Sequence, residues 1–127
     1  MRNTALSAME VLEFADKEHE AFFFENLDKC RCQDVYHMAL IYCLGISETT
    51  RKNINSIYDF KTGSIKTECL CQGWQTSGSI RVVRLAFNLY CNGTPSVNDM
   101  EDTEAKIDEC KEYSVEQIFC CDHAKYF

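Results

Sequence analysis

Residues that interrupt helices are scarce in this chain, which has one proline and five glycines among 127 residues. With few breakers and many helix-forming residues, the sequence favours helices. Hydrophobic residues make up 46% of the chain, which is enough for a packed core and argues against disorder. We therefore predict an ordered, mainly helical protein whose length fits one domain, residues 1–127.

Long hydrophobic runs are also missing. The first twenty residues carry acidic side chains early and lack the apolar segment of a secretory signal. A membrane-spanning helix needs ~20 apolar residues, and the longest run, residues 38–45, is much shorter. We therefore expect a cytoplasmic protein that does not bind a membrane.

The motifs of common enzyme classes are absent as well. The chain has no Gly-rich phosphate loop, no GxGxxG fingerprint and no nucleophile elbow. Thiols and three histidines are present, but no local arrangement pairs a nucleophile with a base. We expect a protein that is not an enzyme and has no catalytic residues.

Helix signals recur along the chain. The pattern predicts helices over about 16–29, over 34–46 with Asp34 as N-cap and Gly45 near a C-terminal cap, and over about 80–90. Shorter or more polar helices are expected from Ser47, over 67–73, over 101–111 and after the capping pattern Ser114 to Gln117. The fold class is all-α in the main: a compact bundle of about five or six helices with a small irregular or β-like insert near 54–66.

Acidic residues are segregated into two segments of a chain whose net charge is −7. Residues 10–28 and 99–116 are strongly acidic, whereas basic residues gather between them. Direct binding to nucleic acid is disfavoured because phosphate contacts need a basic face. A basic protein partner is favoured, although the acids can equally serve only to solvate helix faces. The candidate partner-binding residues are Glu101, Asp102, Glu104, Asp108, Glu109 and Phe23.

Phe23 enters that set because three phenylalanines, Phe22 to Phe24, follow one another. Each residue of a helix turns by about 100°, so the three cannot all face the core. Two are expected inside, and one is left for another element or a partner.

Arg81 and Arg84 share one side of their predicted helix. They can bind an acidic group of a ligand, but pairing with the acidic helix of the same chain is the simpler interpretation.

Nine cysteines without a secretion signal indicate metal binding more than disulfides. Cys30 and Cys32 form one pair, Cys69 and Cys71 a rival pair, and Cys120, Cys121 and His123 a third cluster. A structural zinc ion takes four thiolate or imidazole ligands. The candidate metal ligands are Cys30, Cys32, Cys120, Cys121 and His123, and the alternative is that these thiols are small buried apolar residues.

Four stretches of the chain carry a resemblance to known proteins: DVYHMALIYCLGISETTR, INSIYDFKTGSIKTECL, GWQTSGSIRVVRLAFNLYCNGTPSV and YSVEQIFCCDHAKYF. They resemble a family of short proteins of unknown function from Firmicutes, found on prophages and integrative elements. Cys30, Cys32 and His123 depart from the pattern of that family, so a metal site built on them would be particular to this chain.

The genetic setting that the resemblance implies suggests a function by analogy. Small acidic prophage proteins without enzyme motifs are often inhibitors of host defence, and anti-CRISPR proteins against type II systems bind a basic RNA-guided nuclease. The first hypothesis is such an inhibitor, acting in a bacterial host cell and blocking target-DNA loading or cleavage, with zinc stabilising its fold. The alternatives are an accessory or regulatory protein of a mobile element, and a zinc- or thiol-dependent enzyme.

Overall fold

The computed structural model describes residues 13–98 and 100–127. The predicted fold class is confirmed, because the fold is mainly α-helical with one small two-stranded sheet. Among these described residues, four helices have ten or more residues, and the other helices are single turns. The elements are α2 (Lys17–Lys29), α3 (Val35–Gly45), α4 (Glu48–Lys52), α5 (Ile54–Ile57), β1 (Tyr58–Asp59), β2 (Ser64–Ile65), η1 (Thr67–Cys71), α6 (Ser77–Cys91), α7 (Pro95–Asn98), α8 (Thr103–Glu112), α9 (Val115–Ile118) and η2 (Asp122–Tyr126).

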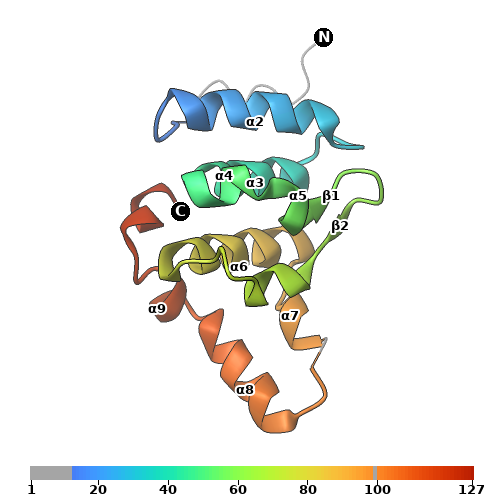
Figure 1. Ribbon diagram of the computed structural model, residues 1–127, viewed down its shortest axis with the longest axis vertical. Helices are drawn as coiled ribbons and strands as arrows, with labels where there is room; N and C mark the ends of the chain where they lie inside the picture. Colours follow the sequence, from blue (N-terminus) through green and yellow to red (C-terminus); the bar gives the residue numbers. More distant parts are fainter. Residues whose placement is uncertain (1–12, 99) are drawn as a thin grey trace.

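Helix α3 lies between α2 and α6 and forms the centre of the molecule (Figure 1). Its side chains are apolar nearly all the way round, so it can bury surface against both neighbours at once. Leu40, Ile41 and Leu44 are completely buried, and Val83 and Phe87 of α6 join them in the core. We call these three helices the body of the molecule.

The helix starts follow the capping signals of the sequence. Asp16 and Asp34 each accept a hydrogen bond from the backbone N–H three residues later, at His19 and His37. Thr76 and Ser79 form a complete capping box at the start of α6. Local side chains therefore determine where the long helices of the body begin.

Gly45 has a different role from the predicted one. The C-cap of α3 is Ile46, and Gly45 is the last helical residue, buried against α2. A Cβ atom on Gly45 would lie 2.7 Å from His19 Cδ2 and 2.9 Å from Phe22 Cδ1. Gly45 is therefore needed because α2 and α3 approach closely there.

The three consecutive phenylalanines divide as the helical periodicity requires. Phe22 and Phe23 are buried, and Phe23 is 0% exposed, whereas Phe24 is 44% exposed. The assignment of Phe23 to a partner surface is therefore wrong, since its ring packs in the core. Phe24 is the phenylalanine of this run that faces outward.

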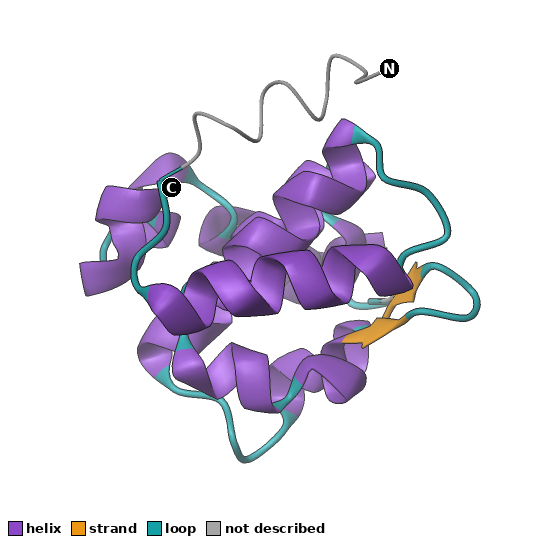
Figure 2. Ribbon diagram, turned by 90° about the horizontal axis from the view of Figure 1, so that it is seen from above, coloured by secondary structure: helices purple, strands orange, loops and turns teal. Residues whose placement is uncertain are grey.

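The predicted insert is a short β-hairpin. Strands β1 and β2 pair antiparallel, with Tyr58 opposite Ile65 and Asp59 opposite Ser64. Gly63 adopts a φ of 73° in the turn, a backbone conformation that glycine reaches at little cost. Seen from above, the hairpin lies at one edge of the helices (Figure 2).

The chain beyond α6 forms a separate arm. Helix α7 leads down to α8, and α9 and η2 return towards the start of α6 (Figure 1). The arm buries few apolar residues, chiefly Tyr113 and Ile118. Among residues 13–98 and 100–127, no helix combines the length and apolar character that crossing a membrane requires.

Candidate functional site

The predicted metal ligands lie on two sides of the molecule. Cys30 follows the end of α2, whereas η2 lies on the side of the molecule where α2 begins (Figure 1). The Cys30 thiol donates to the Asn26 carbonyl at 3.5 Å, and burial raises its pKa to about 11. The Cys30 thiol therefore contacts its own helix and lies apart from the C-terminal candidates.

The C-terminal candidates do not assemble a site with Cys30 and Cys32 either. Cys120 is exposed, and the Cys121 thiol donates to the Ile118 carbonyl at 3.6 Å. The His123 ring lies beside Gly78 at the start of α6. The folded chain therefore does not bring the sequence-predicted ligand set together.

The rival pair is divided between interior and surface. Cys69 is completely buried, and burial raises the pKa of its thiol to about 12, whereas Cys71 is exposed. Cys43 is also buried, with a pKa raised to about 12 by burial. These two buried thiols fit the alternative interpretation of cysteine as a small core residue.

A different group does converge in the structure. Ligand atoms of Cys32, Asp34 and His37 all lie within 4.8 Å of one another at the junction of α2 and α3. Asp34 Oδ1 lies 2.7 Å from His37 Nδ1, and the Cys32 thiol lies 3.6 Å from Asp34 Oδ2. Within the described part of the chain, this is the one cluster of three metal-ligating side chains at such distances.

Sequence reasoning included Cys32 but missed Asp34 and His37 as possible ligands. The sequence indicated only a capping role for Asp34. That capping role could have shown that Asp34 and His37 lie side by side. An N-cap carboxylate bonds the backbone three residues later, so it places the side chain at that position beside itself. The pattern Cys-x-Asp-x-x-His at a helix start therefore indicates one shared location.

The electrostatics of the cluster favour an anion at Asp34. Desolvation opposes ionisation of the Asp34 carboxyl, but hydrogen bonds from the His37 amide and ring and from the Cys32 thiol outweigh it. Its pKa is therefore held below the ordinary value of a carboxyl group.

A pocket of about 400 Å³ opens beside the cluster. Tyr90 of α6 forms its far wall, where the Tyr90 hydroxyl donates to the Gly63 carbonyl at 2.7 Å and lies 3.4 Å from His37 Nε2. The pocket is lined by Arg31, Cys32, His37, Thr62, Gly63 and Tyr90.

The predicted partner-binding acids differ in accessibility. Glu101, Asp102, Glu104 and Asp108 are exposed on or just before α8, and Asp102 also caps that helix. Glu109 is different, because it lies on the side of α8 that faces the body and is buried there. Its assignment to a partner surface is therefore wrong.

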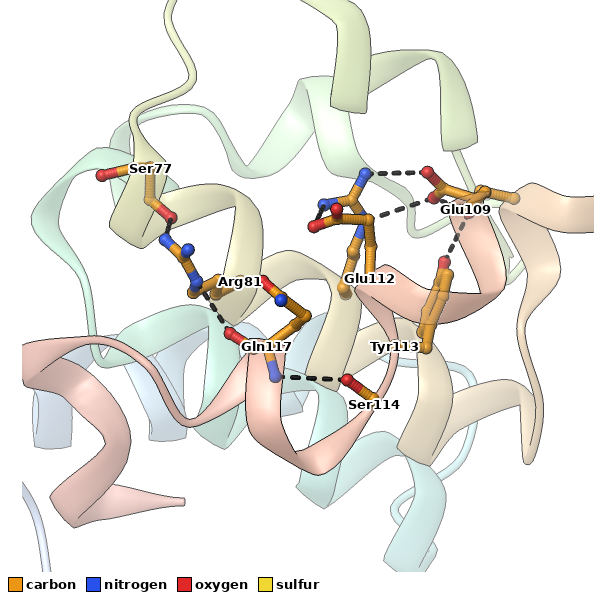
Figure 3. Close-up of polar contacts among 9 residues, drawn as sticks. Ser77, Arg81, Glu109, Glu112, Tyr113, Ser114 and Gln117 are labelled. Carbon is orange, nitrogen blue, oxygen red and sulfur yellow. Dashed lines mark hydrogen bonds and ion pairs between the residues drawn. The ribbon is translucent and has the colours of Figure 1, made fainter. Parts of the chain in front are cut away.

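Glu109 instead connects α8 to the body. Arg84 of α6 contacts both carboxylate oxygens of Glu109, at 2.8 and 3.2 Å, and a third contact reaches Glu112 at 3.5 Å. Ser96 of α7 donates to Glu109, and its hydroxyl also lies 2.7 Å from the Tyr113 hydroxyl. Figure 3 shows the Glu109, Glu112 and Tyr113 side chains of the arm within this polar network.

A second connection involves Arg81. It donates to the Gln117 carbonyl at 2.8 Å and to the Ser77 carbonyl at 2.7 Å (Figure 3). The intramolecular pairing predicted for the two arginines is therefore confirmed for Arg84, while Arg81 binds backbone carbonyls.

Together these features define a small, acidic, mainly helical protein with free thiols and a Cys-Asp-His cluster beside a pocket. A family model matches residues 9–127, so the chain belongs to that family, which is described as a family of unknown function (DUF6075). No curated protein and no solved structure matches the chain significantly.

Proposed function

We propose that this protein is a non-enzymatic inhibitor that binds a basic RNA-guided nuclease of a type II CRISPR system in the cytoplasm of a bacterial host. The observation that carries the proposal is the outward face of α8. Glu104 and Asp108 are exposed there at helical spacing, and Ile107 between them is 53% exposed. We call this surface, together with Glu101 and Asp102, the α8 face.

The α8 face has the chemistry of a docking surface for a basic partner. An apolar residue surrounded by charges resembles the arrangement of interfaces, where buried anchors are rimmed by polar groups. Complementary charge accelerates the encounter and orients the partners. A type II nuclease holds its guide and target in a positively charged channel, which an acidic surface can occupy in place of target DNA.

The ion pair beneath α8 supports the same proposal. Arg84 and Glu109 hold the inner side of α8 against the body, so the outer side is presented in a fixed orientation. A preorganised surface loses less conformational entropy on binding than a mobile segment.

The experiment is a cleavage assay with guide-loaded type II nucleases, combined with a binding assay for labelled target duplex. The variant Glu104→Lys/Asp108→Lys is expected to abolish inhibition while its circular dichroism stays that of the wild type. The matched control is Glu25→Lys/Asp28→Lys, which makes the same change of charge at exposed positions of α2 and should leave inhibition intact.

Two outcomes would contradict the proposal. Full inhibition by the α8 variant would exclude the α8 face as the interface. Absence of inhibition by the wild-type protein across the nucleases tested, with co-purification of a neighbouring gene product, would instead favour the accessory protein of a mobile element.

A further inference from the structure

The pocket between the α2–α3 junction and the hairpin has a feature that the proposed function does not use. Cys32 and His37 line it together with Tyr90 and Gly63, and Asp34 lies beside Cys32 and His37 in the cluster.

The Tyr90 hydroxyl has one proton, which it donates to the Gly63 carbonyl at 2.7 Å. The Tyr58 hydroxyl lies 3.1 Å from the Tyr90 hydroxyl. His37 Nε2 is a third neighbour, at 3.4 Å, and can donate to the Tyr90 oxygen when it carries the ring hydrogen.

The other nitrogen of the His37 ring faces Asp34, with His37 Nδ1 2.7 Å from Asp34 Oδ1. A ring nitrogen and a carboxylate oxygen this close can share one hydrogen, and the same two atoms can bind one metal ion.

We propose that Cys32 Sγ, an Asp34 carboxylate oxygen and His37 Nδ1 bind one divalent transition-metal ion, zinc above all, with a fourth position open to the pocket. A mixed sulfur, oxygen and nitrogen set suits zinc and cobalt better than magnesium or calcium, which prefer oxygen alone. Three protein ligands with an open position distinguish this site from a closed structural one.

The surroundings fit this assignment. Metal-bound histidine usually donates its other ring N–H to a fixed acceptor, and the Tyr90 hydroxyl is that acceptor here. On binding, the thiol proton of Cys32 leaves to solvent, and His37 binds the ion through the Nδ1 lone pair while Nε2 carries the ring hydrogen.

The required movement is small. Bonds of about 2.0–2.3 Å in a tetrahedron put neighbouring ligand atoms about 3.5 Å apart. The three ligand atoms already lie within 4.8 Å of one another. Cys32 is exposed at the junction of two helices, so rotation of its side chain can close the difference.

The test is a titration of the metal-free wild-type protein with Co²⁺, followed by competition with Zn²⁺, under anaerobic reducing conditions. The expected result is one bound cobalt per chain with a thiolate-to-cobalt charge-transfer band and the visible bands of tetrahedral coordination. Zinc should remove both sets of bands. No uptake of either metal by the folded wild type would overturn the proposal.

Three variants test the ligands individually. Cys32→Ser should abolish the charge-transfer band, and His37→Gln should weaken cobalt binding by about tenfold or more. Asp34→Ser removes the carboxylate but keeps a good N-cap residue, so affinity should fall while the helix content is retained. Circular dichroism of each variant separates loss of a ligand from loss of the fold.

Two controls decide whether other thiols are responsible. Cys71→Ser removes an exposed thiol outside the cluster and should bind cobalt like the wild type. Cys120→Ser/Cys121→Ser removes the thiols of the sequence-predicted set and should also bind normally. A charge-transfer band that persists in Cys32→Ser and disappears in the double variant would overturn the proposal.

Discussion

The body and the arm of this molecule are held together by different forces. The body is an apolar assembly in which α3 is buried between α2 and α6. The arm, described over residues 95–98 and 100–127, buries few apolar side chains and is connected to α6 by the Arg84 ion pair and by the hydrogen bond from Arg81 to the Gln117 carbonyl. Apolar packing is non-directional, whereas these polar contacts require particular partners in a particular geometry.

This difference between body and arm assigns stability mainly to the body and partner recognition to the arm. The body supplies most of the buried apolar surface and hence most of the free energy of folding. The arm is held on its inner side by a few polar contacts, which leaves the α8 face accessible to a partner. Four sets of variants test this contrast.

The largest loss of stability is expected from a substitution in the body. Phe23→Ala should lower the free energy of unfolding by about 4 kcal/mol, because it removes a completely buried ring and leaves a cavity. Urea denaturation followed by circular dichroism measures this. The matched control is Phe24→Ala, next in sequence but 44% exposed, which should cost far less. Equal losses from the two variants would show that α2 does not pack as described.

Breaking the ion pair of the arm should cause the next largest loss of stability. Glu109→Ala leaves Arg84, itself only 10% exposed, without its main partner and should cost about 3 kcal/mol. The exposed neighbour provides the control, since Asp108→Ala should change stability by less than about 0.5 kcal/mol.

A double variant separates the polar and apolar contributions of the same site. Arg84→Met/Glu109→Leu should recover much of the loss, because a well-packed apolar pair often replaces a buried ion pair without cost. A double variant as unstable as Glu109→Ala would mean that the arm needs the charges themselves.

Close helix packing should produce a smaller effect. Gly45→Ala places a methyl group 2.7 Å from His19 Cδ2, so α2 and α3 must move apart at a cost of about 2 kcal/mol. Gly73→Ala is the control, because nothing lies within 4 Å of a Cβ atom there. Thermal unfolding of the two variants compares them directly, and an unchanged Gly45→Ala protein would contradict the close approach.

The smallest effect is a pH dependence of the body. His19 is buried, with Nε2 2.8 Å from the Tyr42 carbonyl and Nδ1 accepting from the Ala15 amide at 3.0 Å. Burial lowers the pKa of His19 below its ordinary value of 6.5, despite the opposing hydrogen bond to Tyr42. The unfolded chain therefore binds a proton more readily than the folded one.

The direction of the pH dependence follows from this difference in proton binding. The contribution of His19 is complete above about pH 6.5 and is lost as the pH falls from there through the lower pKa of the folded state. As the pH is lowered from about 7.5 to about 5, a range that spans that value, the unfolding midpoint should fall in the wild type and in His123→Gln, and fall less in His19→Gln. An unaltered slope in His19→Gln would assign the effect to other groups.

Much of the fold could be predicted because its signals are local. The N-caps at Asp16 and Asp34 and the turn at Gly63 depend on residues within a few positions of each other. Helical periodicity likewise required that the three phenylalanines divide between core and surface. It did not say which of them would be outside, because that depends on where α3 packs.

The candidate site was less predictable because it depends on distant contacts. Spacing paired Cys30 with Cys32, yet the Cys30 thiol faces the core and Cys32 faces a pocket completed by Tyr90 of α6. Glu109 and Asp108 are neighbours of the same charge type, but only Glu109 meets Arg84. Composition and spacing do not contain that information.

Residue type and short-range spacing are enough to predict the helical character, the starts of α2 and α3, and the separation of acidic from basic segments. Which thiols are buried, which acids are paired and why Gly45 must lack a side chain follow only from the packed structure. These properties arise from surfaces that meet only when distant parts of the chain pack together, and burial then sets the free energy of every charge and cavity at the contact.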